Sequence, residues 1–74
     1  PLVEVHVIKD AFTHEQKSRI IATVPAALIR DAGDRLRGVT WVNIHEVESG
    51  DWAIGGQPLT ARAVQDIAAG KNVA

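Results

Sequence analysis

Residues 1–8 read PLVEVHVI, an alternation of apolar and polar side chains that predicts the first element of the fold. Val3, Val5 and Val7 share one face of an expected strand over Leu2–Ile8, because successive side chains of a strand point to opposite sides of a sheet. Valine and isoleucine also favour the extended conformation through their branched side chains. We therefore expect a strand with one face toward the core.

A helix and a second strand are expected next. Thr13 and Gln16 have the spacing of a capping box, which predicts a helix start at Thr13, and Gly33 suits a left-handed cap at the helix end. Pro25 falls inside this helix, where it removes one backbone hydrogen bond, so we expect a kink in the turn before it. Residues 39–47 then form a long apolar strand.

The expected helix carries an apolar stripe at helical spacing, which should pack on the sheet. Its members are Ile20, Ile21, Val24, Ala27 and Leu28. The order strand, helix, strand predicts a parallel pair of strands joined by a right-handed crossover. The fold class is therefore α+β, with a β-α-β protomer as its main part.

The segment after the second strand contains shorter elements. Residues 52–54 are too few for more than a small strand or hairpin arm, and Gly55-Gly56 permits the backbone angles of a tight turn. Thr60 can cap a last helix over residues 61–69, which Gly70 would end. We expect one domain over residues 1–74, with a hairpin arm and a helix at its end.

Composition narrows the functional classes. The chain has 74 residues, 46% of them apolar, a net charge of −1 and no cysteine. These values favour a small soluble protein without a nucleic-acid or membrane partner, and a reducing compartment such as the cytoplasm. The longest mostly apolar stretch, residues 20–29, falls short of the roughly 20 residues of a membrane span, and no signal peptide precedes Pro1. A core this small gains from association, so we expect a homo-oligomer.

Pro1 has unusual chemistry when it is the first residue. Its ring nitrogen is then a secondary amine, able to accept a proton or to attack a carbonyl, whereas a proline inside a chain is a tertiary amide. Such an amine can act as a general base near neutral pH. The alternative is that removal of an initiator methionine, or an arbitrary boundary, left proline first.

Several motifs together carry a resemblance to a known family. They are Pro1, the strand that follows it, the helix start at Glu15-Gln16-Lys17, His45-Glu46-Val47 at the end of the second strand, and Gly50-x-Trp52-x-Ile54-Gly55-Gly56. Over roughly residues 1–56 the chain resembles the 4-oxalocrotonate tautomerase family of the tautomerase superfamily. The resemblance implies a dimer in which two β-α-β protomers form a four-stranded sheet backed by two helices. It also favours a hexamer built from such dimers.

The resemblance also implies site residues. Pro1 matches the proline that shuttles a proton in keto–enol isomerisation, with relatives that dehalogenate, hydrate or decarboxylate. Trp52 matches an aromatic pocket wall, and the backbone amide of Ile8 matches a position that helps to hold substrate. No cofactor is expected.

The two arginines that bind a dicarboxylate in well-known members are absent. Their positions fall at Ala11 or Phe12 and at Trp41. Phe12, Trp41 and Trp52 would give an apolar pocket, although Trp41 also suits a subunit interface. Arg35 or Arg37 could reach the site from a neighbouring subunit; Arg37 is kept as a candidate substrate-binding residue.

Histidines and glycines offer weaker alternatives. His6 and His45 could act as acid–base partners, but each is more often a hydrogen-bonded strand residue. Together with His14 they show no metal-ligand spacing, so no metal site is expected. Gly55-Gly56 lacks the lysine of a phosphate-binding loop and is interpreted as a turn.

Two functional hypotheses follow. In the first, Pro1 is the general base of a tautomerase-like isomerase acting on a small enol or 2-oxo acid that is monoanionic and more apolar than a dicarboxylate. In the second, the chain is a non-catalytic assembly subunit of the same fold that lost the arginines.

Overall fold

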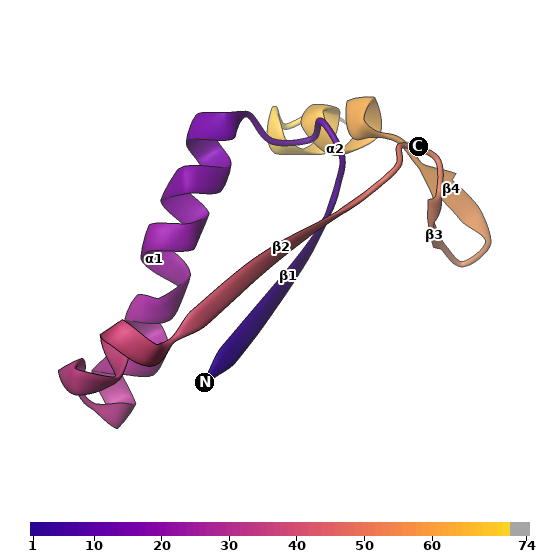
Figure 1. The fold of residues 1–74 in the computed structure, drawn as a ribbon. Helices are drawn as coiled ribbons and strands as arrows, with labels where there is room; N and C mark the ends of the chain where they lie inside the picture. The colour runs from indigo at the N-terminus through magenta and orange to yellow at the C-terminus, as the bar shows by residue number, and fades with distance from the viewer. Residues whose placement is uncertain (72–74) are drawn as a thin grey trace. The chain divides into compact units, whose positions relative to one another are not determined.

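The computed structural model describes residues 1–71 and has the α+β architecture expected from the sequence (Figure 1). Its elements, in chain order, are β1 Leu2–Ile8, α1 His14–Ala32, the 3₁₀ helix η1 Asp34–Val39, β2 Trp41–Val47, β3 Trp52–Ile54, β4 Gln57–Leu59 and α2 Ala61–Ala68. The β-α-β start, the hairpin arm and the last helix are all present.

Strands β1 and β2 form a two-stranded sheet. The backbone N–H of Trp41 donates to the carbonyl oxygen of Pro1 at 2.8 Å, and the N–H of Lys9 donates to that of Val47 at 2.7 Å. The first bond joins the starts of the two strands and the second joins their ends. The strands are therefore parallel, as the order strand, helix, strand requires.

The chain divides into two compact units. The first contains Pro1–Val5 and His14–His45, and the second contains His6–Thr13 and the segment from Glu46 onward. Whether residues 1–74 act as one domain stays a prediction, and residues 72–74 lie outside the described part of the chain.

Helix α1 belongs to the first unit and begins at His14, directly after the expected cap residue Thr13. It continues through Pro25 to Ala32, and the kink expected before Pro25 stays a prediction. The predicted apolar stripe is misplaced, because Pro25 and Ile29 are the buried residues of α1. These two positions, four residues apart, lie above one another on the helix. Proline has no N–H to leave unpaired, so its ring can be buried like an aliphatic side chain.

Three members of the expected stripe are exposed instead: Ile21, Ala27 and Leu28. Ile20 and Val24 have intermediate burial, so the stripe was partly correct at these two positions and wrong at the other three.

The end of α1 differs in detail from the sequence-based expectation. Gly33 has φ 107° and ψ 146°, a conformation with positive φ but outside the left-handed helical region that was expected. Its N–H still donates to the carbonyl of Ile29 at 2.8 Å. Because this backbone region is open essentially to glycine alone, Gly33 allows the chain to leave the helix sharply.

The 3₁₀ helix η1 delays the second strand by two residues, so β2 begins at Trp41 rather than at Val39. The hydroxyl of Thr40 donates to the carbonyl of Leu36 at 2.6 Å, and its N–H lies 3.4 Å from the carbonyl of Arg37. These local bonds hold Val39 in a helical turn in spite of its β propensity.

The second unit contains the β3–β4 hairpin. Trp52 pairs with Leu59 and Ile54 pairs with Gln57 in antiparallel register. Gly55 and Gly56 form the two-residue loop with φ values of 56° and 81°. Positive φ at both central positions is the requirement of a type I′ hairpin turn, so the prediction of a turn is confirmed.

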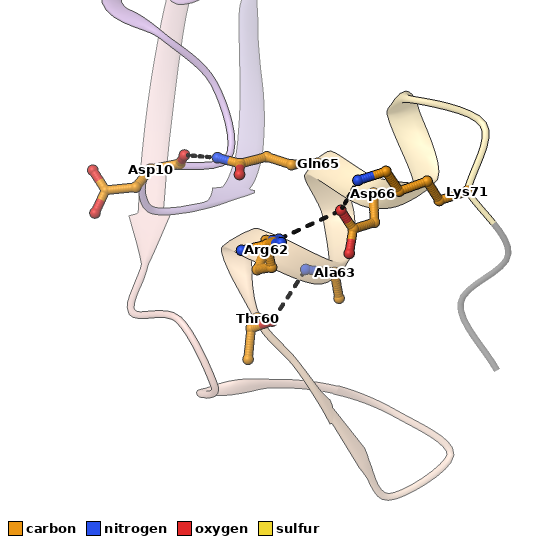
Figure 2. Close-up of polar contacts among 7 residues, drawn as sticks. All are labelled: Asp10, Thr60, Arg62, Ala63, Gln65, Asp66 and Lys71. Atoms are coloured by element: carbon orange, nitrogen blue, oxygen red, sulfur yellow. Dashed lines mark hydrogen bonds and ion pairs between the residues drawn. The ribbon is translucent and has the colours of Figure 1, made fainter.

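Helix α2 also belongs to the second unit and has both predicted caps. The hydroxyl of Thr60 accepts a hydrogen bond from the N–H of Ala63 at 3.1 Å (Figure 2). At the other end Gly70, with φ 79°, donates to Ile67, and Lys71 donates to Asp66 at 2.8 Å. This pair of bonds is a Schellman motif, which ends the helix at Ala68, one residue earlier than expected.

Burial is sparse across residues 1–71. Ile8 and Ile29 are the buried aliphatic side chains of this part of the chain, each 5% exposed. The large apolar side chains that remain exposed are Leu2, Ile21, Leu28, Val39, Trp41, Ile54 and Ile67. No helix within the described residues is long and apolar enough to cross a membrane.

Candidate functional site

A pocket of about 280 Å³ lies within the second unit. The end of β1 supplies His6 and Ile8, and the turn that follows supplies Ala11 and Phe12. Trp52 of β3 lines the same pocket. The two predicted substrate-contacting residues of this unit, Ile8 and Trp52, are thus brought together with the positions where the resemblance expects an arginine.

A tight turn after β1 places Ala11 and Phe12 on the pocket. Asp10 adopts φ 68°, the left-handed region that aspartate tolerates better than most residues. The N–H of Ala11 then donates to the carbonyl of Ile8 at 3.1 Å. The chain therefore reverses within a few residues, and Lys9 anchors the turn through its 3.4 Å ion pair with Glu48.

The hairpin and α2 complete the pocket with Leu59 and Val64. The register of the hairpin sets Leu59 opposite Trp52, so one strand pair provides two walls. The side chain of Ser49 accepts a hydrogen bond from the N–H of Ala61 at 2.9 Å, which fixes the start of α2. The bond therefore holds the start of α2 to the turn that precedes the hairpin.

Leu59 and Val64 were not predicted from the sequence as pocket residues. The Gly55-Gly56 loop was sufficient to find Leu59, because a two-residue loop pairs residue 54 with 57 and hence 52 with 59. Val64 follows the Thr60 cap by four positions, on the apolar side of a short helix. This pattern indicates that Val64 packs inward, but it does not identify the residues against which it packs.

The pocket lining is almost entirely aliphatic and aromatic. His6 is its polar side chain, and neither a lysine nor an arginine is among the lining residues from the described part of the chain. Such a lining favours an apolar group and offers no ion pair to a dicarboxylate.

Pro1, Arg37 and Trp41 belong to the first unit. Pro1 is exposed, and its carbonyl oxygen is bound to the N–H of Trp41. Trp41 is 68% exposed. Of the three residues expected to form an apolar pocket, Phe12 and Trp52 line the pocket of the second unit, and the contribution of Trp41 stays a prediction.

Arg37 lies in η1 with an exposed side chain, 3.8 Å from the carboxylate of Asp34. His45 and Glu4 of the first unit approach to 3.8 Å, Nε2 to Oε1. The second contact fits the interpretation of His45 as a paired strand residue.

Comparison with known proteins agrees with this fold. A family model described as tautomerase enzyme matches residues 1–62. Over 65 residues the chain is 40% identical to probable tautomerase K2 of Dickeya dadantii (strain 3937), an alignment that covers 88% of this chain and 96% of that protein. No solved structure matches.

The chain belongs to the tautomerase family, and the resemblance noted from its motifs is confirmed. The class of protein is therefore an isomerase-type enzyme.

Proposed function

We propose that this enzyme uses the nitrogen of Pro1 as the general base for keto–enol proton transfer on a small enol or 2-oxo acid. The observation that carries the proposal is the family match, which includes Pro1. A proline that is the first residue of a mature chain has a secondary amine, which can serve as a base. The bond from Trp41 to the Pro1 carbonyl supports it, because that bond fixes the proline at the start of β1.

The proposed step balances as an internal proton transfer. The amine of Pro1 takes a proton from the carbon next to the carbonyl, and the electrons of that C–H bond form the enolate double bond. The resulting ammonium group then returns a proton at another atom of the conjugated system. Proton transfer by a positioned group contributes about 10²–10⁴-fold to the rate.

The proposed substrate is more apolar than a dicarboxylate. The resemblance places one arginine at Ala11 or Phe12 and the other at Trp41. Both Ala11 and Phe12 line a pocket that has no cationic side chain among its lining residues from the described part of the chain. Arg37 is our candidate for binding a single carboxylate, and the Ile8 amide and the Trp41 and Trp52 side chains are candidates for further substrate contacts.

The test is ketonisation of phenylenolpyruvate by the native chain and by Pro1→Ala. Intact-mass measurement first establishes that Pro1 carries a free amine. We expect a loss of at least about 100-fold in kcat/KM for Pro1→Ala. Equal rates would rule out Pro1 as the base.

A labelling experiment separates the possible branches of the family. A halopyruvate should modify the nitrogen of Pro1, and peptide mass analysis would locate the label. An NMR titration showing a cationic Pro1 at neutral pH would redirect the proposal to hydratase or dehalogenase chemistry. A chain that neither ketonises nor labels would instead support a non-catalytic subunit.

We also propose that the enzyme is a homo-oligomer. The exposed apolar side chains of the first unit, among them Leu2 and Trp41, support this view, because burying such surface is the main driving force of association. The hexamer built from dimers, the four-stranded dimer sheet and the cytoplasmic location stay predictions.

A further inference from the structure

One wall of the pocket lies beyond the part of the chain that matches the family. The match ends at residue 62, whereas Val64 of α2 lines the pocket and Gln65 follows it. Helix α2 therefore contributes a wall of the pocket that lies outside the residues matched by the family model.

Helix α2 is fixed in place at three points. Its start is bound through the hydroxyl of Thr60 and, at Ala61, through the side chain of Ser49. The third point is the side-chain amide of Gln65, whose Nε2 donates to the carbonyl oxygen of Asp10 at 2.8 Å (Figure 2). A helix held at both its first turn and its middle presents Val64 as a fixed wall.

The bond from Gln65 also holds the opposite side of the pocket. Asp10 is the residue with positive φ in the turn, and Ala11 and Phe12 come directly after it. Aspartate tolerates the left-handed region better than most residues but adopts it less readily than glycine, so contacts that hold the turn favour this conformation. Gln65 supplies one such contact and thereby couples the position of α2 to that of Phe12.

The pocket volume limits what can fit. An apolar cavity of about 150 Å³ is large enough for benzene. The volume of about 280 Å³ found here therefore accommodates a six-membered ring with a short substituent. Since His6 is the polar lining residue, a carboxylate on the same ligand must lie outside the apolar walls.

We propose that α2 is the specificity element of this pocket. The pocket takes an apolar six-membered ring with a short substituent, Val64 limits the size of that ring, and Gln65 is the positioning residue that holds this wall against the turn carrying Phe12. Identifying the ring as part of the substrate rests on the proposed function. Binding of the ring itself does not, and the experiment reads binding separately from turnover.

The probes are 3-phenylpropanoate, which cannot enolise, and propanoate, which lacks the ring. Binding is followed by the indole N–H signal of Trp52, which is assigned by its persistence in Trp41→Phe, since the chain has two tryptophans. We expect saturable shifts of the Trp52 signal with 3-phenylpropanoate and none with propanoate at equal concentration.

Two matched substitutions test the wall. Val64→Phe should fill the pocket and weaken 3-phenylpropanoate binding at least tenfold. Ile67→Phe introduces the same side chain at an exposed position of α2 and should change binding less than twofold. If Val64→Phe fails to fold, Val64→Ala provides the test. It shortens the same side chain, so it should bind 3-(2-naphthyl)propanoate at least fivefold more tightly than the native chain does.

Gln65→Glu tests the positioning role at constant size, because a carboxylate cannot donate to the Asp10 carbonyl. We expect the preference for the phenyl over the naphthyl probe to fall at least threefold. A merely structural loss would weaken both probes equally and leave the preference unchanged, which would overturn the role of Gln65.

The inference about Val64 is overturned if Val64→Phe and Ile67→Phe bind the probe alike, or if Val64→Ala gains nothing for the larger ring. It is also overturned if binding disappears as protein concentration rises, because a second copy of the chain would then occupy the pocket. If the native chain binds the phenyl probe selectively but does not ketonise phenylenolpyruvate, the proposed function is contradicted and the role of α2 stands. If the chain ketonises phenylenolpyruvate but shows no selectivity for the ring, the role of α2 is contradicted and the proposed function stands.

Discussion

The carbonyl oxygen of Pro1 accepts a hydrogen bond from the backbone N–H of Trp41, with 2.8 Å between nitrogen and oxygen. The bond joins the start of β1 to the start of β2 through backbone atoms alone. Neither the proline ring nor the indole is required for it. Changes at the nitrogen of Pro1 can therefore be made without removing the contact that fixes this end of the strand.

The first prediction changes the nitrogen of Pro1 and keeps its carbonyl oxygen. One extra glycine before Pro1 converts the ring nitrogen from an amine into a tertiary amide and leaves the carbonyl acceptor in place. We expect kcat/KM for phenylenolpyruvate ketonisation to fall at least about 100-fold, because the general base is lost. Thermal unfolding should be unchanged.

The control is the same extended chain after aminopeptidase removal of the glycine, with intact mass confirming the product. Recovery of activity would tie the loss to the nitrogen. Full activity in the extended chain would show that the Pro1 amine is not the base.

The second prediction concerns the turn at Gly56. This residue has φ 81°, and a Cβ added there would meet no atom within 4 Å. Gly56→Ala should therefore destabilise the chain through its backbone alone, by about 1–2 kcal/mol in urea unfolding. Gly38→Ala is the matched control, because Gly38 has equally open space and no positive φ. We expect it to be neutral or stabilising by up to about 1 kcal/mol. Equal effects of the two substitutions would contradict the backbone explanation.

The Gly55-Gly56 turn illustrates which parts of the fold could be predicted from the sequence. Local signals sufficed where one residue type determines a conformation, as at Gly55-Gly56 and at the Thr60 cap. The parallel pairing of β1 and β2 followed from the order of elements. Positions whose conformation depends on several competing hydrogen bonds were harder to predict from the sequence. Val39 has high β propensity, yet the bonds from Thr40 to Leu36 and Arg37 keep it in a 3₁₀ turn.

The candidate site shows the same limit. The family resemblance implied Ile8 and Trp52, and both line the pocket, although their contacts with substrate stay predictions. Val64 was not found, because its role depends on how α2 is held, and the bond from Gln65 to Asp10 joins residues 55 positions apart. Helical periodicity likewise misplaced the buried side of α1, since the expected apolar stripe left out Pro25 and Ile29, which are its buried residues.

The third prediction tests the cap of α2. The hydroxyl of Thr60 accepts from the N–H of Ala63 at 3.1 Å, and Thr60→Ala removes that acceptor. We expect a loss of about 0.5–2 kcal/mol, with faster hydrogen exchange at the amides of α2. Thr60→Ser keeps the oxygen and should retain most of the protection. Unchanged exchange in Thr60→Ala would mean that the other anchors hold α2 without the cap.

The fourth prediction separates the two roles of Arg37. Its ion pair with Asp34 spans 3.8 Å between side chains that are largely exposed, and such pairs contribute about 0–1 kcal/mol. Arg37→Ala should therefore leave stability nearly unchanged. If Arg37 binds the substrate carboxylate, KM should rise about tenfold or more, since hydrogen bonds between charged groups are worth about 1.5–3 kcal/mol.

Arg35→Ala is the control for Arg37, because it removes the same charge two residues away in η1. A rise in KM for Arg35→Ala alone would transfer the role to Arg35. No rise in either variant would exclude both arginines from carboxylate binding.

The fifth prediction concerns association. Leu2 is 56% and Trp41 68% exposed, and both lie near the start of a strand in the first unit. Large apolar side chains gain roughly 1.5–3 kcal/mol on burial, so an oligomer that covers Trp41 should depend on it. We expect Trp41→Lys to lower the mass in sedimentation, at concentrations where the native chain is oligomeric. Ser18→Lys adds the same charge at an exposed position of α1 and should leave the mass unchanged. If Trp41→Lys has the same oligomer mass as the native chain, the interface does not include Trp41. Trp41 would then be a candidate for substrate contact alone.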